Sequence, residues 1–387
     1  MKKERFLIYS TVFLIMGLSN SVIPVLPEIA SASSIGPGSI AYTLLFSGYF
    51  IGALLTLIPF GFLADRYNHL KLILLAVALT ALSGIMLILT NNTSLMILAR
   101  MLEGIACGAF FPPAYSILAE YHEKNRYFGE FNFLLNAGLA SGVVVAGFLA
   151  NGSIKGAIVL FTALSLIILS FGTIGSGMCR NKFKDNLIRK TDRGDNISTS
   201  FLAETKKMLN ISLNPEYIRT WIVAFFIFGI TGVMLAYYPQ YSGDMLSKPE
   251  LGIVIAIVYI SSMATNLIAG RSKIGYRKMI NAGIILAALG VIASIRYPIS
   301  GFALLGIGSG IGMIGLPIAV SFMNTDKTDK GLSMGIFTTY TYMGLAFLPI
   351  IIGHFTKYGY QLMFVGAALL MLLTLLLKDS TKKINEL

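Results

Sequence analysis

Residues 40–90 read IAYTLLFSGYFIGALLTLIPFGFLADRYNHLKLILLAVALTALSGIMLILT. Two apolar runs, 40–63 and 71–90, flank the polar segment DRYNHLK, which extends from Asp65 to Lys71. A transmembrane helix needs about 20 apolar residues, and neither run alternates at every second residue as a transmembrane β-strand does. The stretch therefore predicts two membrane-spanning helices joined by a tight polar loop.

Apolar runs of this kind continue along the whole chain of 387 residues. The sequence is 55% hydrophobic and only 12% charged, with a mean hydropathy of +0.75, whereas soluble domains carry about 25% charged residues. The pattern predicts an all-α membrane protein with twelve transmembrane helices. The expected spans are 6–29, 40–63, 71–90, 95–119, 130–150, 154–178, 219–242, 250–270, 278–296, 299–322, 332–354 and 359–377.

A long polar segment between the sixth and seventh spans divides the sequence. We expect a six-helix bundle over residues 1–178, a cytoplasmic central loop over 179–218 and a second six-helix bundle over 219–387. The halves also resemble each other, since GLASGVVVAG at 138–147 is matched by GLAFLPIIIG at 344–353. Parallel repeats of this kind place a substrate site between the halves, near the bilayer midplane.

Positive charge predicts the orientation in the membrane. All but five of the 30 Lys and Arg residues fall in the termini and in loops on the same side as the termini. The positive-inside rule assigns that side to the cytoplasm, so we expect a multi-pass protein of the cell (cytoplasmic) membrane with both termini inside. The cations are spread over many loops, so the net charge of +12 does not indicate a nucleic-acid partner. The five exceptions are Arg100, Lys155, Lys248, Arg296 and Lys357.

The polar loop resembles the signature G-x-x-x-D-R/K-x-G-x-R/K-R/K of the major facilitator superfamily. The matching residues are Gly61, Asp65, Arg66 and Lys71. Asn68 replaces the second glycine, and we expect it to keep the turn because Asn tolerates left-handed backbone geometry. Arg66 and Lys71 could serve only to set topology, but an acid at a membrane boundary gains nothing from that role. The resemblance implies that Asp65 pairs with the start of the eleventh span as a conformational latch between the halves.

The fourth predicted span carries two charged residues, Arg100 and Glu103, in the segment RMLEGIACG. This segment resembles the motif R-x-x-Q-G-x-x-x-A/G of the same family, with Glu103 in place of Gln. Residues three apart share one face of a helix and can pair, and a charge inside a span normally faces a partner or a cavity. The pair is either a structural ion pair or, as we hypothesise, the group that couples transport to protons.

The fifth predicted span contains Gly138, Gly142 and Gly147. Their spacing resembles the antiporter signature G-x-x-x-G-P-x-x-G-G, in which Val143 replaces the proline and Ala146 one glycine. Small residues on one helix face allow close helix approach, and the resemblance implies export.

The end of the first predicted span, with Asn20 and Pro24, resembles the N-x-x-x-P-x-x-P segment of drug exporters. Prolines free backbone carbonyls that neighbouring groups must satisfy. An aromatic residue in a span more often packs against lipid or core than against a substrate. The candidates for the substrate cavity are Asn20, Pro24, Phe111, Asn136, Tyr237 and Tyr340.

Residue types that carry covalent chemistry or bind metals are few and scattered. The three histidines, at 69, 122 and 354, fall in separate segments, and so do the two cysteines, at 107 and 179. No P-loop of the type GxxxxGK[ST] occurs. We therefore expect no enzyme, no catalytic or metal-binding residues, no cofactor and no self-contained ATP-driven pump.

The family resemblance covers the whole chain and is to the drug-exporter branch. It implies a monomeric secondary transporter that exports small amphipathic or apolar compounds in exchange for protons, by alternating access. The middles of the seventh and tenth spans lack an acid, which weakens obligate proton coupling and recognition of strongly cationic drugs. The alternatives are an uptake facilitator or symporter for a small metabolite and a transport-inactive membrane sensor.

Overall fold

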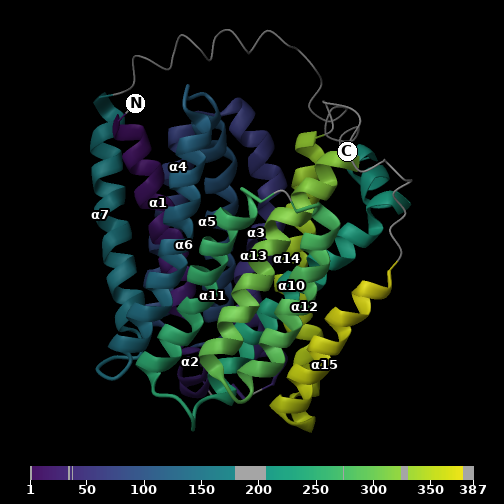
Figure 1. The fold of residues 1–387 in the computed structure, drawn as a ribbon. Helices are drawn as coiled ribbons and strands as arrows, with labels where there is room; N and C mark the ends of the chain where they lie inside the picture. Colours follow the sequence, from purple (N-terminus) through teal and green to yellow (C-terminus); the bar gives the residue numbers. More distant parts are fainter. Residues whose placement is uncertain are drawn as a thin grey trace.

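The computed structural model describes residues 2–33, 35–36, 38–178, 206–272, 274–323 and 330–377. All regular elements within these ranges are helices. Figure 1 shows the long helices side by side in one bundle, with the start of the chain at the upper end and α2 at the lower end. This architecture confirms the predicted all-α membrane fold.

The helices of residues 2–178, here called the first half, begin the bundle. They are α1 (Lys2–Ser21), α2 (Leu26–Ala32), α3 (Ile40–Arg66), α4 (His69–Leu89), α5 (Thr93–Ala119), α6 (Lys124–Leu149) and α7 (Gly156–Met178).

Residues 206–377, the second half, begin with a short helical stretch at 206–212. The other helices are α10 (Pro215–Tyr241), α11 (Lys248–Ala269), α12 (Tyr276–Ser294), α13 (Pro298–Met323), α14 (Lys330–Gly353), η1 (His354–Tyr358), α15 (Tyr360–Leu373) and η2 (Thr374–Leu376). Residues 179–205 of the predicted central loop lie outside the described residues, so the division at 178 and 219 stays a prediction.

Ten of the described helices are long and apolar enough to cross a membrane. The predicted first span is broken, because α1 and α2 are bent by 60° at a break that contains Pro24. Proline cannot donate a backbone hydrogen bond and clashes with the preceding turn. The predicted twelfth span is the shorter apolar stretch Tyr360–Leu376, which at 1.5 Å per residue is roughly 25 Å long and close to the lower limit for a span.

Two helix starts differ from the expectations because asparagine side chains cap them. Asn68 has φ −62° and accepts hydrogen bonds from the backbone N–H groups of Leu70 and Lys71. It therefore keeps the turn as an N-cap in extended geometry, not through a left-handed backbone. Asn214 caps α10 in the same way, and Pro215 follows at the first helical position. The seventh predicted span thus begins at residue 215 and not at 219.

Packing across the halves positions the candidate site. Within the first half, α3 and α4 pack on α5 and α1 packs on α6; within the second, α12 packs on α13 and α10 on α14. The halves also touch where α2 contacts α10, but their most extensive contacts are made by two helix pairs, α3 with α14 and α6 with α11. A route between the halves would therefore be flanked by these four helices.

Candidate functional site

Hydrogen bonds close the bundle at the end where α2 lies (Figure 1). Tyr42 of α3 donates from its hydroxyl to the carbonyl of Ala236 at 3.0 Å, and the hydroxyls of Thr43 and Tyr237 are 2.6 Å apart. The rings of Tyr42 and Tyr237 stack with their centroids 5.8 Å apart. These contacts tie α3 of the first half to α10 of the second.

An ion pair joins the halves at the same end. Lys248, the first residue of α11, pairs through Nζ with Oε1 of Glu28 on α2 and also donates to the carbonyl of Pro24 at 3.1 Å. Both side chains of the ion pair are largely covered, at 21% and 31% exposure. The break between α1 and α2 thus supplies a carbonyl to Lys248, and α2 supplies the carboxylate.

The opposite end is the one where the chain begins (Figure 1), and its interface helices are less buried. None of residues 54–63 of α3 and 259–268 of α11 is buried, whereas most of residues 41–49 and 251–258 of the same helices, toward the α2 end, are. Gly61 lies near the end of α3, and Gly129 and Gly335 lie near the starts of α6 and α14. A Cβ atom built on any of these glycines would meet no described atom within 4 Å. At the α2 end a Cβ on Gly353 would collide with the Tyr237 hydroxyl, although one on Gly359 would also meet no described atom within 4 Å. The conformation is closed at the α2 end and looser at the other.

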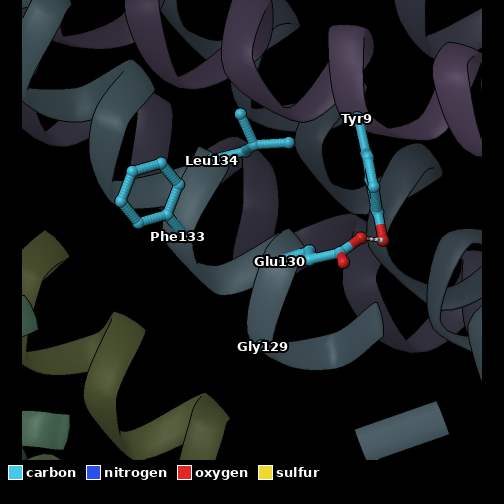
Figure 2. A pocket seen from close by; sticks show the side chains of 5 residues that line it. All are labelled: Tyr9, Gly129, Glu130, Phe133 and Leu134. Carbon is cyan, nitrogen blue, oxygen red and sulfur yellow. Dashed lines mark hydrogen bonds between the residues drawn. The ribbon is translucent and has the colours of Figure 1, made fainter. Parts of the chain in front are cut away.

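A pocket of about 460 Å³ lies between α1 and α6 in the looser half of the bundle (Figure 2). Its lining residues are Tyr9, Gly129, Glu130, Phe133 and Leu134, and Tyr9 donates to Oε2 of Glu130 at 2.9 Å. Gly129 and Phe133 lie on the same face of α6 as Gly147, which packs against α11 of the second half. Tyr9 and Glu130 meet between α1 and α6. The pocket therefore borders the interface between the halves.

The three glycines of the predicted antiporter-like motif lie in two different interfaces. A Cβ on Gly138 or Gly142 would collide with the backbone of α1, at Phe13 and Gly17. A Cβ on Gly147 would collide with the carbonyl of Lys248, at the start of α11. The motif thus allows close packing within the first half and close approach between the halves.

Two of the six cavity candidates face the interface between the halves. Asn20 donates to the carbonyl of Leu139 on α6 at 3.1 Å, and the Tyr259 hydroxyl of α11 lies close to its side chain. Asn136 precedes Val143 by two turns of α6, on the face that packs against Gly252 of α11. Polar groups therefore meet between α1, α6 and α11.

The other four candidates are occupied with packing in this conformation. Pro24 and Tyr237 belong to the closed α2 end. Phe111 lies in an aromatic cluster with Phe110, Phe131 and Tyr115. Tyr340 stacks on Trp221 with centroids 5.4 Å apart, which packs α14 on α10. The structure therefore does not gather the six candidates into one cavity.

Arg100 and Glu103 form the buried pair that their spacing allows. Arg100 Nη1 and Glu103 Oε2 are 2.6 Å apart, and the side chains are 2% and 0% exposed. Arg100 also donates to the carbonyl of Leu45 on α3 at 2.9 Å and to that of Ser19 on α1 at 3.2 Å. The second oxygen of Glu103, Oε1, is buried and has no hydrogen-bond partner among the described residues. The pair thus joins three helices and keeps one unused acceptor.

A tyrosine and a cysteine lie next to this pair. Cys107 is four residues after Glu103 on α5, and its thiol lies 3.8 Å from the hydroxyl of Tyr342 on α14. Tyr49 of α3 belongs to the same buried cluster as Cys107, and the Arg100 guanidinium lies 5.7 Å from the Tyr49 ring centroid. Sequence reasoning missed Tyr49 and Tyr259, because a tyrosine in an apolar run carries no signal that separates packing from function.

The predicted loop latch is only partly described. Gly61 and the backbone of Asp65 and Arg66 belong to α3, and Lys71 lies in the first turn of α4. The side chains of Asp65 and Arg66 lie outside the described part of the chain, as do residues 324–329 before α14. The latch therefore stays a prediction.

Comparison with known proteins gives a family match over nearly the whole chain. The profile of the Major Facilitator Superfamily matches residues 8–246 and 220–385. Multidrug resistance protein 2 of Bacillus subtilis is 23% identical over 360 residues, which cover 88% of this chain and 85% of that protein. The quinolone resistance protein NorA of Staphylococcus aureus is 29% identical over 157 residues, 40% of each chain. The matched stretch thus spans well under two thirds of NorA.

Solved structures share the fold at low identity. The nucleoside transporter NupG superposes with a TM-score of 0.72 at 14% identity, covering 96% of this chain and 98% of that one. A POT family transporter bound to a thioalcohol-conjugated peptide superposes with a TM-score of 0.73 at 12% identity, covering 96% and 94%. At such identities the likeness concerns the fold alone.

Proposed function

The chain belongs to the Major Facilitator Superfamily, and we propose that it exports small amphipathic or apolar organic compounds in exchange for protons. The protein is a transporter and not an enzyme. Two relatives named for quinolone and multidrug resistance support export of drug-like compounds. The glycines at 138, 142 and 147, with their antiporter-like spacing, agree with this direction.

The buried Arg100–Glu103 pair carries the proposal of proton exchange. An ionised pair inside an apolar bundle is tolerated only while each partner offsets the desolvation of the other. If Arg100 and Glu103 separate during the cycle, the carboxylate is left unpaired in an apolar site and gains by taking up a proton. Glu103 then binds a proton in one conformation and releases it in the other, although the seventh and tenth spans lack an acid.

The contacts at one end of the bundle support alternating access. We assign both termini and the looser end to the cytoplasm, in line with the positive-inside rule, and the α2 end to the outside. The conformation is then inward-facing, since the contacts of Tyr42, Thr43 and Lys248 close the outer end. Substrate enters from the inside, binds between the halves near Asn20, and leaves when these contacts break.

A ligand screen followed by flux measurement tests the function. Thermal stability of the purified protein is measured with norfloxacin, ethidium, nucleosides and dipeptides, and a stabilising compound is then followed in proteoliposomes with and without a pH gradient. We expect norfloxacin to stabilise the protein more than the permanently cationic ethidium does, and the gradient to drive norfloxacin export. Stabilisation by nucleosides or dipeptides alone would contradict the proposed substrate class. Flux that does not depend on the pH gradient would contradict proton exchange.

A further inference from the structure

The backbones of α6 and α11 touch at the closed end of the bundle, and glycines make this contact possible. A Cβ atom on Gly147 would collide with the carbonyl of Lys248 and would lie 3.2 Å from the Cα atom of Gly252. A Cβ atom on Gly252 would lie 2.6 Å from the carbonyl oxygen of Val143. A side chain at either glycine would push the two helices apart, so this pair holds the halves in direct backbone contact.

The same faces of the two helices each carry another glycine at the looser end. The helices are antiparallel, because α6 begins at the looser end whereas α11 begins at Lys248, beside α2. Gly129 precedes Gly147 by 18 residues, and Gly270 follows Gly252 by 18 residues. Eighteen residues make five full turns and about 27 Å of α-helix, and neither stretch contains a proline. Gly129 and Gly270 therefore lie equally far from the first pair, each on the face turned to the other helix.

This second pair of glycines makes no contact between the halves in the present conformation. A Cβ atom on Gly129 would meet no described atom within 4 Å. One on Gly270 would meet only the carbonyl oxygen of Asn266, one turn back on the same helix, at 3.0 Å. None of residues 259–268 of α11 is buried. The two helices therefore diverge from their contact at the closed end toward the cytoplasmic side.

The local structure requires glycine at neither position. Gly129 lies in the second turn of α6, and glycine destabilises the interior of a helix. Gly270 follows the last residue of α11, where a glycine in left-handed geometry often ends a helix. Its φ is −64°, which any residue can adopt. What the two positions share is the absence of a side chain on the face turned to the other half.

The second helix pair between the halves repeats the spacing. At the closed end, a Cβ atom on Gly353 of α14 would lie 3.3 Å from the Thr43 hydroxyl of α3. Gly61 follows Thr43 by 18 residues, and Gly335 precedes Gly353 by 18 residues. A Cβ atom on Gly61 or Gly335 would meet no described atom within 4 Å. Both interfaces thus have a close contact at the α2 end and a pair of open glycines five turns away.

We propose that Gly129 and Gly270 come into backbone contact when the cytoplasmic end closes, as the glycine pair at the outer end does in this structure. Gly61 and Gly335 approach each other in the same way across α3 and α14. Either end can then close tightly, because no side chain stands between the helices. The inference rests on alternating access, which is part of the proposed function, but on neither the substrate class nor proton exchange.

Disulfide formation tests the contact directly. After replacement of the two native cysteines, Gly129→Cys is combined with Gly270→Cys, and membranes are treated with an oxidant. A disulfide needs Cα atoms within about 7 Å and Cβ atoms that face each other. The matched control combines Gly129→Cys with Ile268→Cys. Ile268 is 72% exposed and, two residues before Gly270, points to nearly the opposite side of α11.

We expect the disulfide between positions 129 and 270 to form at least about tenfold faster than the one between 129 and 268. Equal rates in the two double variants would overturn the proposed contact.

A bulky residue at position 129 gives a second test. Gly129→Leu has room in the present conformation, so thermal stability should not fall, but leucine keeps the helices apart when the cytoplasmic end closes. Closure is measured as the rate of disulfide formation between Gly61→Cys and Gly335→Cys. Gly366→Leu on α15 is the matched control, because a Cβ atom on Gly366 would also meet no described atom within 4 Å.

We expect Gly129→Leu to slow the disulfide between positions 61 and 335 by about tenfold, and Gly366→Leu to leave its rate unchanged. The proposal is overturned if Gly129→Leu leaves that rate unchanged or slows it no more than Gly366→Leu does. Neither test uses a drug-like compound or a pH gradient. Failure of the glycine contact is therefore distinguishable from failure of the proposed export or of its coupling to protons.

Discussion

At the residue scale, a guanidinium among apolar helices must place five N–H donors without help from bulk water. Arg100 places three of them, by bonding to Glu103 on its own helix and to carbonyls of Leu45 and Ser19 on two neighbours. The carboxylate of Glu103 combines two functions. One oxygen holds Arg100 in place, and the other, which has no hydrogen-bond partner among the described residues, is available to bind a proton. The structural and the proton-coupling interpretations of the pair therefore predict different results for its two members.

Arg100→Ala should destabilise the protein by about 3–5 kcal/mol, because it leaves a buried carboxylate without its partner. Glu103→Gln should keep most of the stability, since Gln still accepts a hydrogen bond from Arg100, but lose the response of transport to a pH gradient. Thermal unfolding in detergent and flux in proteoliposomes measure the two effects. Equal destabilisation by both variants would support a purely structural pair.

At the element scale, α6 shows how one helix serves two interfaces. Gly142 faces the backbone of α1 and Gly147 that of α11, while Gly129 near the start of the helix faces open space. Backbone groups cannot move aside as a flexible side chain can, so a methyl group at the first two positions has to push whole helices apart. The same substitution should therefore have opposite effects along this one helix.

Gly142→Ala should lower stability by about 1–3 kcal/mol through overpacking. Gly129→Ala is the matched control on the same helix and should raise stability by about 0.5–1 kcal/mol, because alanine loses less backbone entropy than glycine. Thermal unfolding followed by fluorescence of Trp221, the single tryptophan, reports both changes. A stabilised Gly142→Ala variant would contradict the close approach of α6 to α1.

At the scale of the whole molecule, the halves are held together at the α2 end by polar contacts that can break and re-form. The largely covered pair Glu28–Lys248 and the hydrogen bonds of Tyr42 and Thr43 contribute small free energies individually. An interface made of such contacts can be opened by the binding energy of one substrate.

Lys248→Met should favour opening at the α2 end, and the exchanged pair Glu28→Lys with Lys248→Glu should restore closure. A partly exposed ion pair is worth up to about 1 kcal/mol, which changes the ratio of closed to open molecules about fivefold. Spin labels at Ser153 and Tyr297, exposed residues of the two halves at this end, report the separation. An unchanged distance distribution in Lys248→Met would show that the ion pair does not hold the end closed.

Membrane orientation is a second property of the whole molecule. After replacement of Cys107 and Cys179, a cysteine at Ser153 or Ser247 should react with an impermeant maleimide added to intact cells. A cysteine at the exposed residue Asn210 should react only after the cells are opened. Labelling of position 210 in intact cells, with position 153 protected, would reverse the assignment.

The sequence by itself determined the membrane class, most of the spans and the pairing of Arg100 with Glu103. These follow from local rules, because the length of an apolar run must match the bilayer and residues three apart on a helix share one face. The asparagine caps at 68 and 214 were also readable in principle, since Asn followed by a helix start is a local signal. The predicted spans were placed from hydropathy, which counts only apolar residues, and therefore did not include these caps.

Only the tertiary structure decided which groups meet across the halves. Lys248 reaches Glu28, Tyr259 reaches Asn20 and Tyr342 reaches Cys107 over more than 200 residues of chain. Such contacts depend on how helices cross and how each is rotated about its axis. A tyrosine in an apolar run has the same local sequence pattern whether it packs in a core or lines a transport pathway. For this reason the aromatic residues predicted to line one cavity lie in different places in the structure. The buried ion pair was predicted correctly because both of its partners lie on one helix.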